Sequence, residues 1–142
     1  MNSRLPAYAL LAAALAGCAI HQDVKPVGSL PARQICVIEN PAVAQDEFLQ
    51  VYMRALRDKG FEVRQIAPGS PLTACPVTTT YNARWRWHWA LVMYLAELRV
   101  YSNGQSAGEA RYTSGREAPE QYIRAETKIR ELVDQMFPAR VQ

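Results

Sequence analysis

Residues 77–88 read Val77-Thr78-Thr79-Thr80-Tyr81-Asn82-Ala83-Arg84-Trp85-Arg86-Trp87-His88, the clearest period-two pattern in the chain. Its odd-numbered positions are mostly apolar, whereas every even-numbered position is polar. Successive side chains of a strand point to opposite faces of a sheet, so this alternation predicts a strand with one buried face. The sheet that contains this strand is therefore expected to have one covered face and one face open to solvent.

Two further strands are expected directly after this stretch. Residues 91–101 alternate in the same way, and Ser102-Asn103-Gly104 has the composition of a hairpin turn into the next strand. A three-residue loop, with its glycine in the left-handed conformation, places Leu98 beside Gly108. A two-residue Asn-Gly loop would place Leu98 beside Glu109 instead. We predict the three-residue loop, because it groups small and apolar side chains on one face.

The segment before residue 77 has the pattern of a β-α-β unit. Residues 34–39 form a mostly apolar run, which is typical of a strand with neighbours on both sides. Residues 45–59 carry apolar side chains at steps of three and four, so they predict a helix with one apolar stripe. Residues 61–66 form a short second strand. Two strands joined by one helix are expected to be parallel.

A second helix is expected from Pro119 to about Phe137, where Pro138 stops it. Two helices can cover only one face of a five-stranded sheet. We therefore predict a fold of the α/β (α+β) class, a two-layer sandwich with both helices on one face. Its five-stranded mixed sheet has the order 2-1-3-4-5, with strands numbered along the chain. Residues 34–142 form this single domain, which is large enough for one hydrophobic core.

The first residues of the chain have the features of a bacterial export signal. Arg4 precedes an apolar run of about twelve residues, which is too short to span a bilayer. Leu15-Ala16-Gly17-Cys18 follows this run and resembles the lipobox of bacterial lipoproteins. The resemblance implies that residues 1–17 are a signal peptide, that cleavage falls between Gly17 and Cys18, and that the Cys18 thiol carries a lipid. The alternative is a buried N-terminal helix that contains a cysteine.

The next residues refine the destination of the chain. In the lipoprotein family, an Asp after the lipidated cysteine signals retention in the inner membrane, whereas this chain has Ala19. The resemblance therefore implies a lipid-anchored protein of the outer membrane that faces the periplasm. Residues 18–33 are polar and contain several proline and glycine residues. We expect the lipidated cysteine to continue into a flexible tether over this range.

The other cysteines fit an oxidising compartment. If lipid occupies Cys18, the remaining cysteines are Cys36 and Cys75. Two remaining cysteines in the periplasm predict one disulfide, and the alternative is two separate buried thiols. Each lies at the beginning of an expected strand, so a bridge between them supports contact between the strands at residues 34–39 and 77–88. It would also make these two strands parallel.

Arg84, Arg86 and His88 are the most prominent polar cluster, because they share one face of the strand at residues 77–88. One interpretation is a ledge that binds anionic groups, such as lipid phosphates, glycan carboxylates or the acidic surface of a partner. The other interpretation is a solvated strand face, with its arginines paired to acidic residues of the following strands.

Three tryptophans lie in or next to the same strand. Trp85 and Trp87 are on its apolar side, so we expect them to pack in the core, although tryptophan rings also stack on sugars. Trp89 falls at the expected turn, and we predict that it is exposed.

Composition and motifs exclude several classes of function. The formal net charge of +3 is too weak for a nucleic-acid-binding protein. The chain has no glycine-rich phosphate loop after a strand, no CxxC and no HExxH, so we predict no metal and no cofactor. A Ser-His-Asp set would need His88, and no serine has the context of a nucleophile elbow. We therefore expect a protein that is not an enzyme.

Several short motifs are shared with one family. They are Trp87-His88-Trp89-Ala90, Tyr94-Leu95, Ala96-Glu97-Leu98-Arg99-Val100-Tyr101, Asn103-Gly104, Glu126-Thr127-Lys128-Ile129, and Cys36-Val37-Ile38-Glu39-Asn40-Pro41 with Cys75. On these motifs nearly the whole mature chain resembles a family of small bacterial lipoproteins of the Sbal type. That family has Asp where this chain has His88. The resemblance implies an envelope lipoprotein without an assigned activity, so it supplies no catalytic residues.

Two functional hypotheses follow from the sequence. The first is a lipid-anchored envelope lipoprotein that acts as a non-enzymatic accessory or binding module. Its partners are the membrane, through the lipid anchor, and an envelope protein. The alternative is a hydrolase or transferase that acts on envelope polymers through a site near His88. This alternative requires a cleft with a carboxylate or hydroxyl within hydrogen-bonding distance of the imidazole.

Overall fold

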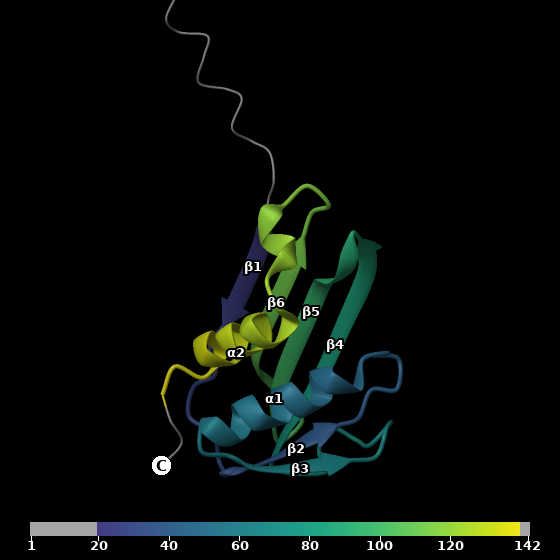
Figure 1. The fold of residues 1–142 in the computed structure, drawn as a ribbon. Coiled ribbons are helices and arrows are strands. Elements are labelled where there is room, and N and C mark those ends of the chain that lie inside the picture. Colours follow the sequence, from purple (N-terminus) through teal and green to yellow (C-terminus); the bar gives the residue numbers. More distant parts are fainter. Residues whose placement is uncertain (1–19, 140–142) are drawn as a thin grey trace, which may run out of the picture.

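Six strands form one mixed sheet, and two helices pack on one of its faces (Figure 1). The computed structural model describes residues 20–139, so the predicted signal peptide, its cleavage point and the lipidation of Cys18 lie outside the described residues. The strand order is β1-β6-β5-β4-β2-β3. The elements are β1 (Ile20–Lys25), β2 (Gln34–Ile38), α1 (Asp46–Asp58), β3 (Glu62–Ile66), β4 (Val77–His88), β5 (Ala90–Ser102), β6 (Gln105–Ser114), the 3₁₀ turn η1 (Pro119–Tyr122) and α2 (Ala125–Met136).

The predicted fold class is confirmed, with one strand added. The predicted order 2-1-3-4-5 corresponds to β3-β2-β4-β5-β6 in the structure. Strand β2 is parallel to both β3 and β4, whereas β4, β5 and β6 form an antiparallel meander. The sixth strand, β1, pairs antiparallel with β6 and extends the sheet at its far edge.

The expectation of a flexible tether over residues 18–33 is wrong for its first part. Every second residue of β1 is half-buried and the residues between them are exposed, which is the period of an edge strand. Lys128 of α2 holds this strand, because its Nζ donates to Gln22 Oε1 at 3.1 Å and to Glu131 Oε2 at 2.7 Å. The hydrogen bond from Lys128 also lowers the pKa of the Glu131 carboxyl. The half-buried Gln22 is polar, so the strand alternation has only two apolar members, Ile20 and Val24, and is not evident in the sequence.

The chain after β1 is also packed against the domain. The N–H of Val27 donates to the carbonyl of Met136 at 2.8 Å, and the Val27 side chain is buried. Gly108 of β6 faces this side chain, and a Cβ built there would overlap Val27 Cγ2. A larger residue at position 108 would therefore require Val27 to move. The folded domain begins at least as early as Ile20.

The β5–β6 hairpin groups its small and apolar side chains on one face as expected, but its loop and register differ from the prediction. Asn103-Gly104 has φ values of 49° and 80°, so the loop has two residues in the left-handed region and not the predicted three-residue form. A β-bulge at the Val100-Tyr101 step then shifts the register by one residue. As a result, Leu98 lies opposite Ala110 and not opposite the predicted Gly108. The bulge keeps the small and apolar side chains together, which was the basis of the prediction.

Helix α1 confirms the helix predicted over residues 45–59 and forms the main aromatic contact with the sheet. The ring of Phe48 stacks on that of Tyr81 with centroids 5.5 Å apart. The hydroxyl of Tyr52 lies 2.7 Å from Thr79 Oγ1, and both residues are fully buried. Burial raises the pKa of the Tyr52 phenol. The paired hydroxyls therefore satisfy each other in the core, where an unpaired hydroxyl is costly.

The second helix is shorter than the predicted range from Pro119 to Phe137. The first residues form only the 3₁₀ turn η1, and the α-helix begins at Ala125. Between them Arg124 has φ −57° and ψ 135°, an extended conformation that interrupts the helix. Tyr122, which the helical pattern places in the buried stripe, is therefore on the surface.

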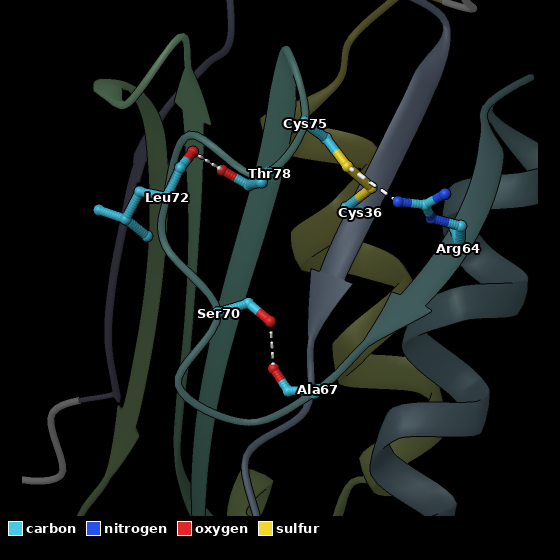
Figure 2. Close-up of a disulfide and its surroundings, with 7 residues drawn as sticks. All are labelled: Cys36, Arg64, Ala67, Ser70, Leu72, Cys75 and Thr78. Carbon is cyan, nitrogen blue, oxygen red and sulfur yellow. Dashed lines mark hydrogen bonds between the residues drawn. A yellow bond between two sulfur atoms is a disulfide. The ribbon is translucent and has the colours of Figure 1, made fainter.

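The predicted disulfide between Cys36 and Cys75 is present and links β2 to the segment just before β4 (Figure 2). Both half-cystines are buried, and their Cα atoms are 6.1 Å apart. The parallel contact between β2 and β4 confirms the adjacency that the bridge predicted. The loop over residues 67–76 crosses the face of the sheet that has no helices, where Thr78 Oγ1 donates to the carbonyl of Leu72 at 2.6 Å.

Candidate functional site

The β4–β5 hairpin ends in exposed apolar side chains. Trp87, Trp89 and Leu91 are 76%, 89% and 52% exposed. Trp89 forms the turn itself with a φ of 59°, which few residues other than glycine adopt. The prediction that Trp89 is exposed is confirmed. The prediction that Trp87 packs in the core is wrong, because the hairpin extends beyond the layer of helices that would cover it (Figure 1).

Trp85 packs as predicted, two positions back along the same strand. Its side chain is half-buried and stands edge-on to Phe48 of α1, with centroids 6.1 Å apart and an interplanar angle of 89°. A β-bulge between Arg84 and Trp85 shifts the register with β5 at this point. The change from covered to exposed apolar side chains therefore falls between Trp85 and Trp87.

The turn η1 and the residue after it add two more apolar side chains to this end. Tyr122 and Ile123 are 47% and 38% exposed. The Tyr122 hydroxyl lies 2.5 Å from His88 Nδ1, so it is directly beside the hairpin. Over residues 20–139, the large apolar side chains that are exposed all lie at this end, and we refer to them as the apolar tip: Trp87, Trp89, Leu91, Tyr122 and Ile123.

The chain enters the domain at the same end (Figure 1). Ile20, the first residue of β1, pairs with Ser114, the last residue of β6. Turn η1 follows β6 by a short connection. Cys18 precedes Ile20 by two residues, and two extended residues span at most about 7 Å. The position predicted to carry the lipid is therefore attached to the end of the domain that carries the apolar tip.

Arg86 does not present its guanidinium to solvent as the predicted ledge requires. Its Nη2 donates to the carbonyls of Ser114 and Gly115 at 3.2 and 2.8 Å, and to Gln121 Oε1 at 3.0 Å. Its guanidinium also lies 5.0 Å from the centroid of the Tyr94 ring. Arg86 thus ties the connection between β6 and η1 to the sheet, and this connection positions the second part of the apolar tip.

We expect Arg86→Ala to lower the free energy of unfolding by about 1.5–3 kcal/mol, because it removes hydrogen bonds from a charged donor to three acceptors, two of them on the buried residues Ser114 and Gln121. Urea denaturation of the two proteins measures this change. Arg84→Ala is the matched control, since Arg84 is exposed on the neighbouring position and surface changes usually stay within about 0.5 kcal/mol. Equal stability of the two variants would contradict the role assigned to Arg86.

His88 is held by neutral partners. Besides the Tyr122 hydroxyl, its Nδ1 lies 3.5 Å from Gln121 Nε2. Gln121 is itself buried and donates to the carbonyl of Arg116 at 2.6 Å. The hydroxyl that the enzyme hypothesis requires near the imidazole is thus the Tyr122 phenol. Both side chains of the His88–Tyr122 pair reach the surface.

Within residues 20–139, no group of three or more His, Cys, Asp or Glu side chains is arranged to hold a metal ion. The same part of the chain contains no helix that is both long enough and apolar enough to cross a bilayer.

A cavity of about 270 Å³ opens beside the apolar tip, between the first turns of α1 and α2. Its floor is apolar and its rim is charged. Leu91 belongs both to the rim and to the apolar tip. The lining residues are Gln45, Glu47, Phe48, Val51, Trp85, Leu91, Arg124, Ala125, Glu126 and Ile129.

The fold defines a two-layer α/β sandwich whose mixed sheet is open on one face. Among solved structures it is similar to the PelC dodecamer from Paraburkholderia phytofirmans, with a TM-score of 0.61, 17% identity and coverage of 87% of this chain and 100% of that chain. A variant of the same PelC with one substitution gives a TM-score of 0.60 at 16% identity, with the same coverage. At this identity the similarity shows a shared fold. No protein-family model and no curated protein matches the chain.

Proposed function

We propose that this chain is a lipoprotein of the bacterial outer membrane, anchored through Cys18 and facing the periplasm. It serves as a non-enzymatic accessory module whose apolar tip rests on the bilayer surface. One observation carries this proposal: the exposed large apolar side chains of residues 20–139 all lie at the end where the chain arrives from Cys18. The lipobox-like Leu15-Ala16-Gly17-Cys18 supports the lipid anchor independently.

The composition of the apolar tip fits the boundary between headgroups and acyl chains. Tryptophan and tyrosine concentrate at this boundary in membrane proteins, because their rings are apolar and carry one polar group. Arg116 and Arg124 are exposed on either side of η1, where they can approach lipid phosphates. A side chain such as Trp89 gains from leaving water only if a surface covers it, and the bilayer beside the anchor supplies that surface.

Tryptophan fluorescence of the lipidated protein in vesicles with brominated acyl chains tests this contact. We expect strong quenching of the protein with all three tryptophans, because Trp89 reaches the acyl boundary and Trp87, opposite Leu91, lies about 7 Å from it. The double variant Trp87→Phe with Trp89→Phe retains only Trp85 as an emitter, and we expect it to lose most of the quenching. Both proteins keep the lipid anchor, so they are attached to the vesicles in the same way and differ only in the two tryptophans. Equal fractional quenching of the two proteins would contradict a membrane-facing tip.

The alternative function, hydrolysis or transfer on envelope polymers near His88, has less support. A catalytic histidine needs a second group that orients it and a nucleophile or activated water in reach. Within the described residues, the partners of the imidazole are the Tyr122 phenol and the Gln121 amide. We therefore assign no catalytic role to His88. An envelope protein partner stays a prediction.

A further inference from the structure

The cavity beside the apolar tip combines an apolar floor with charges of both signs. Phe48, Val51 and Ile129 are buried and close its floor, and Trp85 forms one wall. Glu47, Arg124 and Glu126 line its rim. A purely apolar ligand would leave these charges without partners, and a simple anion would meet two carboxylates.

The three charged side chains of the rim differ in whether they already have a partner within the protein. Glu126 Oε1 already lies 3.3 Å from Arg130 Nε. Within the described residues, the side chains of Glu47 and Arg124 have no hydrogen bond or ion pair. One free carboxylate and one free guanidinium therefore face the same small space. A ligand that matches both and fits a cavity of about 270 Å³ must carry a cation and an anion within one small group.

The tryptophan in the cavity wall indicates which kind of cation the ligand carries. An ammonium group over the face of a tryptophan gains a cation–π interaction, and Trp85 lines the same cavity as the carboxylates of Glu47 and Glu126. A primary ammonium also donates hydrogen bonds to carboxylates, which a quaternary ammonium cannot do. On the other side, the Arg124 guanidinium matches a phosphate, and the first turns of α1 and α2 add to the positive potential there.

The position of the cavity matches the layer in which such a group occurs. Leu91 is two residues from Trp89 along β5, which is about 7 Å at 3.4 Å per residue. The headgroup layer on each side of a bilayer is about 5–8 Å thick. When Trp89 reaches the acyl boundary, the cavity mouth at Leu91 lies level with the lipid headgroups.

We propose that this cavity binds the phosphoethanolamine headgroup of a bilayer lipid. The ammonium lies against Trp85 and Glu47, and the phosphate lies against Arg124. At about 270 Å³ the cavity is smaller than most sites for drug-sized ligands, as a headgroup site should be. The inference rests on the proposed contact of the apolar tip with the membrane. It assigns to the domain a preference for one class of lipid, in addition to the anchor.

Titration of glycerophosphoethanolamine into the lipidated protein in maltoside detergent tests this proposal. The Trp87→Phe, Trp89→Phe protein is used, because its single tryptophan, Trp85, reports on the cavity. We expect a saturable change in fluorescence. Arg124→Gln and Glu47→Gln should each weaken the apparent affinity about tenfold, as expected for losing a charged hydrogen bond. Arg54→Gln removes an exposed arginine of α1 outside the cavity and should leave the affinity unchanged.

Two further titrations show whether the fluorescence change depends on the primary ammonium, on the phosphate, or on both. Glycerophosphocholine and inorganic phosphate should each bind at least about tenfold more weakly, because neither offers a primary ammonium joined to a phosphate. An equal response to phosphate, or no saturable response to glycerophosphoethanolamine, would overturn the headgroup site. Quenching by brominated lipids measures the membrane contact separately, so the loss of the headgroup site with quenching intact leaves the proposed function standing.

Discussion

Replacement of Cys18 by serine, with residues 1–17 exchanged for a cleavable export signal without a lipobox, is expected to move the protein from the membrane fraction to the soluble periplasmic fraction. Each acyl chain contributes about 0.8 kcal/mol per buried methylene, and several chains on one residue make release very slow. The apolar tip alone offers only a few side chains, so it cannot replace the anchor. We expect at least about a hundredfold fall in the ratio of membrane-bound to soluble protein, measured by immunoblot after fractionation of the cells.

The control for this prediction is the fold of the variant. Residues 20–139 form the complete sheet and both helices without Cys18, so thermal unfolding should be the same with serine at this position. If the serine variant unfolds like the parent and yet remains fully in the membrane fraction, the lipid anchor is not what holds the protein there.

Removal of the disulfide is expected to give a large loss of stability. Cys36 and Cys75 are 39 residues apart, and closing a loop of this length stabilises a protein by about 4 kcal/mol in the chain-entropy model. Domains of this size are stable by only about 5–15 kcal/mol in total. Cys36→Ala with Cys75→Ala should therefore lower the free energy of unfolding by about 3–4 kcal/mol, measured by urea denaturation.

Reduction of the parent protein supplies the matched comparison. In reductant the parent should approach the stability of the double alanine variant, whereas the variant should not respond to reductant. A difference below about 1 kcal/mol between oxidised parent and variant would show that the bridge does not constrain the unfolded chain as assumed.

The sequence predicted the centre of the fold well, because periodicity there is strong. Residues 77–88 alternate cleanly, and the helix over residues 45–59 has a regular apolar stripe, so both were placed within a residue or two. Strand β1 was missed because the apolar members of its alternation are only Ile20 and Val24. Strand β1 is held by its pairing with β6 and by the hydrogen bond from Lys128 to Gln22, and both are distant in the sequence. The predicted three-residue loop of the β5–β6 hairpin was wrong, because a two-residue turn followed by a β-bulge gives the same grouping of apolar side chains.

The candidate site was less predictable than the fold. Trp87 follows the apolar period of its strand, but the sequence does not say where the helix layer ends, so its exposure could not be predicted. Arg86 was expected to face a ligand and instead binds the β6–η1 connection. Tyr122 was placed in a helix that starts later. The extended Arg124 before Ala125 is a tertiary feature with no local sequence signal. The cavity was missed because its lining comes from four elements.

Intact-mass spectrometry of the protein purified from membranes tests the lipid anchor most directly. We predict a chain that begins at Cys18 and carries the added mass of a diacylglyceryl group and an amide-linked fatty acid. A chain that retains Met1, or that is cut elsewhere and has no acyl mass, would contradict a lipoprotein and leave the apolar tip without its anchor.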